Sequence, residues 1–131
     1  MKPKRVLDSF AVLAYLQGEQ GHEAVVSALT EPGAALMNEI NVGEVYYILA
    51  RARGRTQADF FLGTILPQLP ITIVGNSFDD IVAAARIKAE HPLAYADCFA
   101  AATARKENAR LLTGDPEFES VASLISIEWI R

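Results

Sequence analysis

The sequence predicts an α/β fold in which helices cover both faces of an open, parallel β-sheet. Short apolar runs alternate along the chain with longer segments whose apolar residues recur at helical spacing. This alternation is typical of parallel sheets, because each parallel strand needs a crossover segment before the next one. In such folds the ligand site lies at the carboxyl ends of the strands, so polar residues at those ends are candidates for function.

In the N-terminal half, strand and helix signals follow one another closely. Phe10, Leu13 and Leu16 recur at helical spacing after the first apolar run. Pro32-Gly33 closes the next helical segment. The expected elements are a strand at 5–7, helices at 9–17 and about 21–29, a strand at 34–37 and a helix at 42–53.

In the C-terminal half, two helix starts carry a capping pattern. Thr56 with Asp59, and Ser77 with Asp80, are each spaced as an N-cap and its third residue. Pro92 breaks the helix that follows Ser77. The expected elements are a helix at 56–66, a strand at 71–74, helices from 77 to about 90 and at 94–106, a strand at 110–112, a helical turn at 116–119 and a final strand at 125–129.

Composition limits the class of protein. At 131 residues the chain has a common single-domain length, so we expect one domain over 1–131. The net charge of −4 argues against binding of nucleic acid through bulk positive charge. No apolar run approaches the ~20 residues of a membrane helix, and the N-terminal apolar segment is too short for a signal peptide. The single Cys98 agrees with a reducing compartment, so we expect a cytoplasmic protein.

Asp8 and Asp115 each stand where an expected strand ends and a helix begins. Both therefore lie at the edge of the sheet where α/β enzymes keep their sites. Each is equally well explained as an ordinary helix N-cap, and Pro116 fits the first helical position after Asp115. Taken singly, neither residue predicts a function.

Glu44 and Asp97 lie near the starts of expected helices. Glu44 follows Asn41 by three residues, so the two side chains share a face beside the apolar stripe of their helix. Glu39 is a rival acid, which we expect to precede that helix. Asp97 is the lone acid in an otherwise small and apolar segment, where a buried carboxylate needs a cation or hydrogen bonds. The ordinary alternative for both is stabilisation by the helix dipole.

Taken together, the four carboxylates point to one edge of the sheet. Carboxylates that converge there repel one another and are forced to protonate, unless a cation compensates their charge. Mg²⁺ and Mn²⁺ prefer oxygen ligands and resolve this conflict. A two-metal site of this kind activates a water for phosphodiester hydrolysis, so the sequence predicts a metal-dependent nuclease.

The same residues lie in motifs with a family likeness. The motifs are Val6-Leu7-Asp8-Ser9, Asn41-x-x-Glu44, Tyr95-Ala96-Asp97 before an alanine-rich helix, and Leu111-Leu112-Thr113-Gly114-Asp115-x-x-Phe118. In this order and at these separations they resemble the PIN-domain nucleases, and within that family the VapC-type toxins of toxin–antitoxin pairs. The resemblance covers essentially the whole chain.

The resemblance implies a three-layer α/β/α sandwich with a parallel sheet of about five strands. It implies Mg²⁺- or Mn²⁺-dependent cleavage of RNA, a homodimer, and inhibition by a small, DNA-binding, VapB-like antitoxin. The family's acidic quartet falls on Asp8, Glu44, Asp97 and Asp115. Its supporting polar positions fall on Ser9, Asn41 and Thr113. This chemistry requires no His, Cys or Ser nucleophile, and we interpret His22 and His91 as structural or solvated.

Two further groups of side chains carry information about partners. A basic group closes the helix at 42–53 and consists of Arg51, Arg53 and Arg55. Complementation of the helix dipole is the favoured interpretation, and contact with RNA phosphates beside the site is the alternative. An aromatic group lies on adjacent helices and consists of Tyr46, Tyr47, Phe60 and Phe61. We expect most of it in the core, with some members available to an antitoxin helix.

Rival functions remain open at this point. A non-catalytic PIN-like module would bind antitoxin or RNA without cleaving it, and a housekeeping RNA-processing nuclease would lack an antitoxin. A phosphotransfer domain is disfavoured, because Asp8-Ser9-Phe10 lacks a second Asp two residues after the first. Nucleotide binding through a glycine-rich loop is disfavoured because the eight glycines never cluster.

Overall fold

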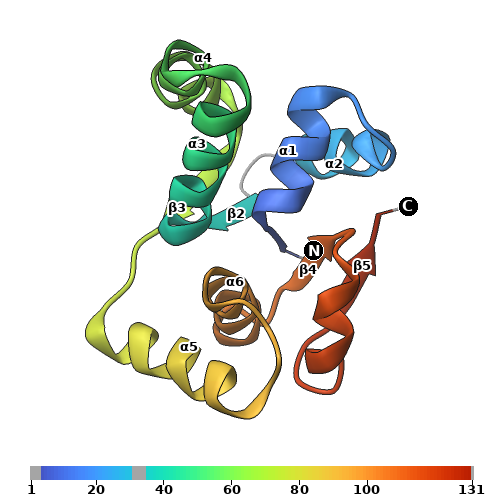
Figure 1. The fold of residues 1–131 in the computed structure, drawn as a ribbon. Coiled ribbons are helices and arrows are strands. Elements are labelled where there is room, and N and C mark those ends of the chain that lie inside the picture. The colour runs from blue at the N-terminus through green and yellow to red at the C-terminus, as the bar shows by residue number, and fades with distance from the viewer. Residues whose placement is uncertain (1–3, 31–34, 131) are drawn as a thin grey trace.

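In the described residues of the computed structural model, 4–30 and 35–130, five strands form one parallel sheet (Figure 1). The strand order is β3-β2-β1-β4-β5. The strands are β1 (Arg5–Leu7), β2 (Ala35–Asn38), β3 (Ile71–Val74), β4 (Arg110–Thr113) and β5 (Ile127–Trp129). Because β1 and β4 are neighbours at the centre, the residues that follow them emerge side by side at one edge.

Helical segments connect the strands in chain order. They are α1 (Ser9–Gln17), α2 (His22–Leu29), α3 (Glu39–Arg53), α4 (Arg55–Phe60), a π-helical turn (Phe61–Ile65), a 3₁₀ turn (Leu66–Gln68), α5 (Phe78–Glu90), α6 (Tyr95–Lys106) and a 3₁₀ segment (Pro116–Val121). In the ranges that the structure describes, no helix has the length and apolar character needed to cross a membrane.

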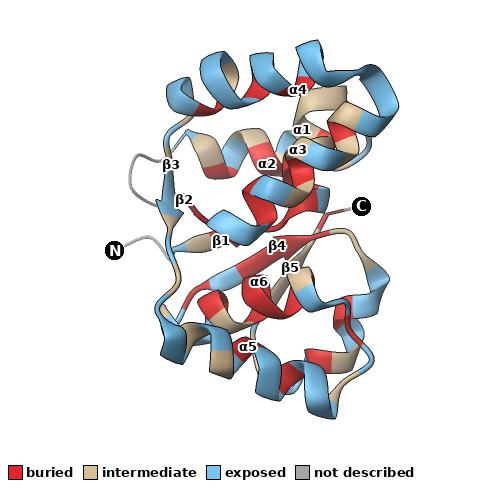
Figure 2. Cartoon of the chain, turned by 60° about the vertical axis from the view of Figure 1, so that its left-hand side comes forward, coloured by how far each residue is buried: buried red, intermediate tan, exposed pale blue. Residues whose placement is uncertain are grey.

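Two hydrophobic cores lie between the sheet and the helices, one on each face of the sheet. Along each central strand successive side chains alternate between the two faces: Leu7 and Leu112 pack beneath α1 and α3, whereas Val6 and Leu111 pack against α6. Figure 2 shows buried residues concentrated in the sheet and on the inward faces of both helix layers. The molecule is therefore a three-layer α/β/α sandwich with a parallel sheet, as the sequence predicts.

The start of α3 differs from the expected one. The helix was expected from residue 42 but begins at Glu39, because the Asn38 side chain caps it by accepting a hydrogen bond from the Ile40 amide at 2.9 Å. Glu39 is thus the first residue of the helix and does not precede it. This change places Glu44 in the second turn and not the first.

The expected capping pairs divide into one that forms and one that does not. Ser77 and Asp80 form a complete capping box at the start of α5. Thr56 does not cap α4, whose N-cap is Gly54 without a side-chain hydrogen bond. Asp59 instead accepts a hydrogen bond from the Tyr46 hydroxyl at 2.6 Å, which joins α4 to α3.

Three other elements differ from the expected bounds by two residues or more. The single helix expected at 56–66 is α4 followed by a π-helical and a 3₁₀ turn. The helical turn at 116 runs on to Val121, and the last strand begins at Ile127 instead of residue 125. The Pro32-Gly33 stop lies outside the described residues.

Candidate active site

Asp8 follows β1 at the carboxyl edge of the sheet and is almost fully buried, with 1% of its surface exposed. Its Oδ1 caps α1 by accepting a hydrogen bond from the Ala11 amide at 2.8 Å. Its Oδ2 accepts a short hydrogen bond from the Thr113 hydroxyl at the end of β4. The cap therefore uses one carboxylate oxygen, while the hydroxyl from the neighbouring strand fixes the direction of the other.

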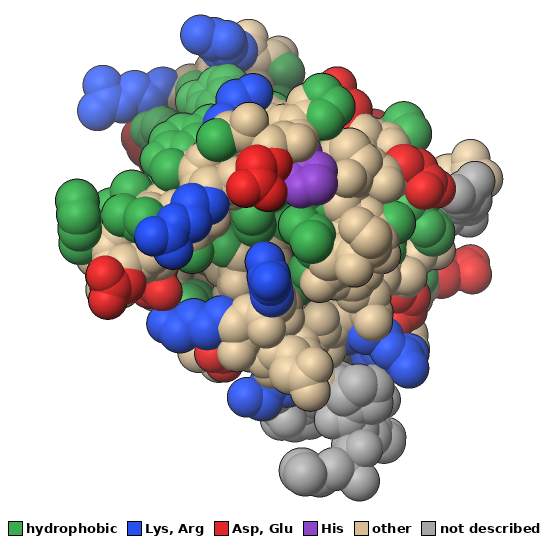
Figure 3. Space-filling model, turned by 90° about the horizontal axis from the view of Figure 1, so that it is seen from below, with side chains coloured by type: hydrophobic (Ala, Val, Ile, Leu, Met, Phe, Trp, Pro, Cys, Tyr) green, Lys and Arg blue, Asp and Glu red, His purple; other side chains and the backbone are tan. Residues whose placement is uncertain are grey.

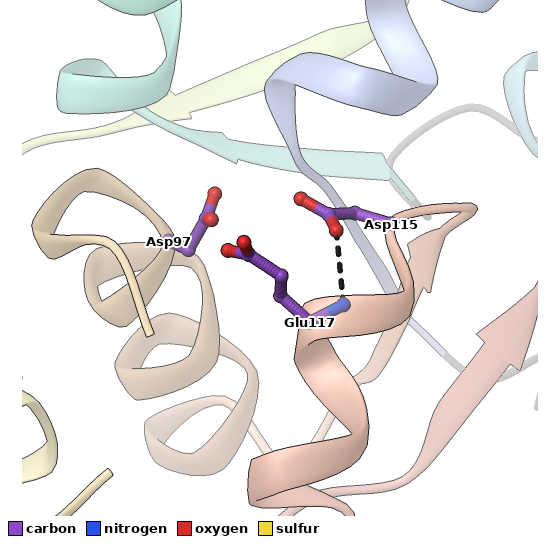
Figure 4. Close-up of side chains that lie close together, drawn as sticks. All are labelled: Asp97, Asp115 and Glu117. Carbon is purple, nitrogen blue, oxygen red and sulfur yellow. Dashed lines mark hydrogen bonds between the residues drawn. The ribbon is translucent and has the colours of Figure 1, made fainter. Parts of the chain in front are cut away.

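Asp115 lies directly beside Asp8, because Thr113 contacts both residues. The Asp115 amide donates to Thr113 Oγ1 at 3.0 Å. The Asp115 carboxylate caps the following 3₁₀ segment by accepting from the Glu117 amide at 3.0 Å (Figure 4). Capping again holds the carboxylate in place without excluding it from a second role.

Asp97, Asp115 and Glu117 bring carboxylate oxygens to within 4.8 Å of one another. Asp97 comes from the first turn of α6 and is 7% exposed, whereas Glu117 comes from the 3₁₀ segment after β4. Figure 4 shows the Asp97 and Glu117 carboxylates pointing toward each other, with Asp115 beside them. Sequence reasoning missed Glu117, although its place two residues after Asp115 in the same capped turn was a usable signal.

Glu44 lies outside this cluster of three carboxylates, on α3 at the opposite face of the sheet. Its Oε1 accepts a hydrogen bond from the Ser9 hydroxyl at 2.6 Å, and its charge raises the pKa of Asp97. Its rival Glu39 is engaged elsewhere, since Glu39 Oε2 accepts from the Asn76 amide at 2.7 Å. Of these two acids, Glu44 is therefore the one whose field acts on Asp97.

Asn41 holds α3 against α6 next to Asp97. Its Nδ2 donates to the Ala96 carbonyl at 3.1 Å, and the residue is fully buried. Its Oδ1 is buried without a hydrogen-bond partner among the residues that the structure describes. A buried amide oxygen without a hydrogen bond lowers the stability of the fold. Besides the carboxylates, the Asn41 Oδ1 atom is therefore a further polar group at this edge of the sheet that lacks a partner among the described residues.

The electrostatics of the group are those of crowded acids. Burial raises the pKa of Asp8 to about 7, against hydrogen bonds from Thr113 and Ala11 that lower it. Burial also raises the pKa of Asp97 to about 7, helped by the charges of Glu44, Asp115 and Glu117. A hard divalent cation among these oxygens would compensate both their buried charge and their mutual repulsion, which together favour the protonated acids. The donor set, which consists of carboxylates, fits Mg²⁺ or Mn²⁺.

Among the described residues, no basic side chain neutralises this group by an ion pair. Arg51, Arg53 and Arg55, for which contact with RNA phosphates is the alternative interpretation, lie seven to eleven residues after Glu44, at and beyond the far end of α3. At the helical rise per residue this is roughly 10 Å or more. Arg51 instead packs over the Tyr47 ring, 5.2 Å from its centroid, and Arg55 Nε lies 3.7 Å from Asp59 Oδ2.

The two histidines lie outside this group of acids. His22 begins α2 and stacks on Tyr15 with ring centroids 5.6 Å apart. His91 follows the last residue of α5 as its C-cap. Among the described residues, neither imidazole forms a hydrogen bond or an ion pair with these carboxylates.

The aromatic residues expected in the core divide between core and surface. Phe61 is fully buried and Tyr46 is partly buried against the core beneath α1 and α3. Tyr47 and Phe60 are exposed. The exposed pair therefore carries no packing role comparable to that of Phe61.

Solved structures share this architecture. VapBC2 from Rickettsia felis, bound to a DNA fragment from its promoter, aligns with a TM-score of 0.76 at 18% identity, covering 97% of this chain and 98% of that chain. DNA-bound VapBC from Salmonella typhimurium aligns with a TM-score of 0.74 at 16% identity, covering 97% and 98%. VapC20 from Mycobacterium tuberculosis, a toxin that cleaves the sarcin–ricin loop, aligns with a TM-score of 0.75 at 16% identity, covering 93% and 97%.

Sequence comparison assigns the family. No curated protein sequence matches the chain significantly. The family model of the PIN domain matches residues 5–124, which include every carboxylate described above. The chain therefore belongs to the PIN domain family.

Proposed function

We propose that the protein is a metal-dependent endoribonuclease and the toxin of a VapBC-type toxin–antitoxin pair. The observation that carries this proposal is the convergence of Asp97, Asp115 and Glu117 within 4.8 Å, beside the buried Asp8. Membership of the PIN domain family supports a nuclease, and the match of the fold to VapC-type toxins supports the toxin role.

We assign the carboxylates of Asp8, Glu44, Asp97 and Asp115 to metal binding and catalysis, and we add Glu117 to this set. Asp97, Asp115 and Glu117 would hold the ion most directly, since their oxygens already lie together. A bound Mg²⁺ or Mn²⁺ supplies Lewis acidity, which activates water and stabilises charge on the phosphate and the leaving oxygen.

The chain's own residues orient the reactants. The hydroxyls of Ser9 and Thr113 are buried and already donate to Glu44 and Asp8, and we assign the attacking oxygen to a water. We assign Glu44 as the acceptor of that water's proton, because Ser9 bonds only Oε1. The new bond joins the water oxygen to phosphorus, the bond from phosphorus to the leaving ribose oxygen breaks, and solvent returns a proton to that oxygen.

Asn41, Ser9 and Thr113 are positioning residues in this scheme. Asn41 fixes the start of α6 through the Ala96 carbonyl, Ser9 fixes Glu44, and Thr113 fixes Asp8 and Asp115. Each connects two elements at the same edge of the sheet. Replacement of any of the three should therefore displace the carboxylates that it holds in position.

The partners follow from the toxin assignment. We propose that residues 1–131 act as one domain, that the chain forms a homodimer, and that a small VapB-like antitoxin with a DNA-binding domain inhibits it. The proposed substrate, cellular RNA, places the activity in the cytoplasm. A short reading frame next to the gene of this protein, encoding such an antitoxin, would support this assignment. Its absence would favour a housekeeping RNA-processing nuclease.

The test is cleavage of end-labelled RNA by the purified protein. We expect internal cleavage with Mg²⁺ or Mn²⁺, none with EDTA, and none with Asp97→Asn, which keeps the shape of the side chain but removes its charge. Asp79→Asn is the matched control, since Asp79 is an exposed acid in the first turn of α5. An active Asp97→Asn enzyme would refute the site, and a wild type that binds metal but cleaves no RNA would favour a non-catalytic module.

A further inference from the structure

Gly114 stands between two polar residues of the site and is closely packed. It follows Thr113, the last residue of β4, and precedes Asp115. A Cβ atom built on Gly114 would overlap the Phe10 ring and would lie 2.9 Å from the Ile130 carbonyl oxygen. Both approaches are closer than a real Cβ atom makes. The turn between β4 and the 3₁₀ segment therefore has no room for a side chain at this position.

The φ angle of Gly114 does not account for the glycine. Among the described residues, the glycines with positive φ are Gly18, Gly21 and Gly54, and Gly114 is not one of them. Residues with a side chain adopt negative φ, so this angle alone would admit one here. What excludes a side chain is the close approach of Phe10 and Ile130.

Phe10 makes this contact from the first turn of α1. It follows Asp8, which caps α1, and Ser9, which donates to Glu44. The Phe10 ring lies against the Gly114 backbone, although the residue is 40% exposed and belongs to neither hydrophobic core. A smaller side chain at position 10 would therefore remove the contact without opening a cavity in a core.

Asp115 is held by contacts of two kinds. Two hydrogen bonds act within its own segment, because its amide donates to Thr113 Oγ1 and its carboxylate accepts from the Glu117 amide. These bonds shape the turn but leave its distance from α1 open. The ends of the turn are anchored by the hydrogen bond from Thr113 to Asp8 and by the burial of Phe118 in the core on the α6 face. Between these anchors, the contact at residue 114 joins the turn to α1.

We propose that Phe10 is a positioning residue for Asp115. Its ring lies on Gly114 and sets how closely the turn approaches α1, and Gly114 permits this approach because it has no Cβ atom. The contact thereby keeps the Asp115 carboxylate within 4.8 Å of the oxygens of Asp97 and Glu117. This inference rests on the proposed metal site and adds to it two residues that offer no ligand atom.

The experiment measures the Kd for Mn²⁺ by calorimetry and the Tm in EDTA for Gly114→Ala, Phe10→Ala and the double variant. Gly114→Ala forces the turn away from the ring, so it should raise the Kd by about tenfold or more and lower the Tm by roughly 5 °C. Phe10→Ala frees the turn and should also raise the Kd, with a smaller loss of Tm because the ring is partly exposed. In the double variant the alanine methyl enters the space of the missing ring. Its Kd should therefore equal that of Phe10→Ala, and its Tm should exceed that of Gly114→Ala.

Two variants are matched controls. Gly63→Ala makes the same substitution at an exposed glycine with open space around the added Cβ, so it should leave the Kd for Mn²⁺ unchanged. Ile87→Ala removes a buried side chain from α5, on the side of the molecule seen in Figure 3, where basic and acidic side chains are interspersed. It should lower the Tm at least as much as Gly114→Ala does and yet bind Mn²⁺ as the wild type does. If Ile87→Ala weakens Mn²⁺ binding as much, loss of stability explains the effect and the proposal is wrong.

Unchanged Mn²⁺ binding in both single variants would refute the positioning role of Phe10. So would single losses of binding free energy that add up in the double variant, because additivity means that the two residues do not act through one contact. If Gly114→Ala does not fold, recovery of folding in the double variant supports the contact, and a wild-type Kd in Phe10→Ala overturns the proposal. A wild type that binds no Mn²⁺ refutes the metal site itself, whereas the Tm values in EDTA still test the contact.

Discussion

Replacement of Asp8 by Asn tests the electrostatics of the site without removing its hydrogen bonds. The Asn Oδ1 can still accept from the Ala11 amide, and its Nδ2 can donate to Thr113 Oγ1 in place of the bond that Thr113 now donates. The substitution therefore removes mainly a buried negative charge. In metal-free protein we expect Asp8→Asn to be more stable than the wild type.

The magnitude follows from the pKa of Asp8, which burial raises from 3.8 to about 7. Between these values the folded protein keeps a proton that the unfolded chain has lost, so the stability of the wild type falls as pH rises. The cost of this charge is roughly 2 kcal/mol at pH 5 and roughly 4 kcal/mol at pH 8. Asn carries no such cost, and for a domain of this size the gap in Tm should widen by roughly 5–10 °C from pH 5 to pH 8.

The assay is thermal unfolding in EDTA at pH 5 and pH 8, followed by addition of Mn²⁺. Mn²⁺ should raise the Tm of the wild type most at pH 8 and that of Asp8→Asn much less, because the variant lacks one ligand. Asp79→Asn is the control and should show no widening gap. A variant that is less stable than the wild type by the same amount at both pH values would refute the assignment of a buried, strained charge to Asp8.

Three further changes test the surrounding contacts. Thr113→Val leaves Asp8 Oδ2 and the Asp115 amide without their partner, so it should destabilise the fold by about 1–3 kcal/mol in urea unfolding and weaken Mn²⁺ binding in calorimetry; unchanged values would contradict the role of Thr113. Glu44→Gln keeps an acceptor for Ser9 but cannot take a proton, so Mn²⁺ should still bind through Asp97, Asp115 and Glu117 while RNA cleavage falls by about 10²-fold or more; an active variant would exclude Glu44 as the base. Replacing Arg51, Arg53 and Arg55 by Gln should leave RNA affinity nearly unchanged, because these residues lie at the far end of α3; a lower affinity with a flatter salt dependence would place phosphate contacts there.

Much of the fold could be predicted because its signals are local. Ser77 with Asp80 and the break at Pro92 act within a few residues, and α1 and β3 agree with expectation at both ends. The start of α3 was displaced by three residues because Asn38, at the end of β2, is also a cap. A residue that ends one element and starts the next gives no separate signal in the sequence.

The region after α4 could not be predicted in the same way. Ala58, Phe61 and Leu66 are all buried in the same core. The backbone changes from α-helix to a π-helical turn and then to a 3₁₀ turn across these residues, which lets all three face that core. Such a change depends on what the side chains meet across the core, which the periodicity of the sequence does not contain. Asp59, which was expected to form a cap with Thr56, instead accepts a tertiary hydrogen bond from the Tyr46 hydroxyl.

At the site, the sequence located residues at strand ends better than residues in turns. Asp8 and Asp115 were placed by the ends of β1 and β4, and Asp97 by its apolar surroundings. Glu117 was missed because its approach to Asp97 depends on the 3₁₀ geometry of the segment after Asp115. For the arginines the sequence favours complementation of the helix dipole, and Arg51 and Arg53 lie in the last turn of α3.

An anomalous-scattering map from crystals soaked in Mn²⁺ tests the central claim most directly. The arrangement of the carboxylates predicts a peak among Asp97, Asp115 and Glu117, whose oxygens already lie within 4.8 Å of one another, with Asp8 beside it. Crystals of Asp97→Asn should lack that peak. The absence of any peak at this edge in wild-type crystals at saturating Mn²⁺ would contradict a metal-dependent nuclease built on these acids.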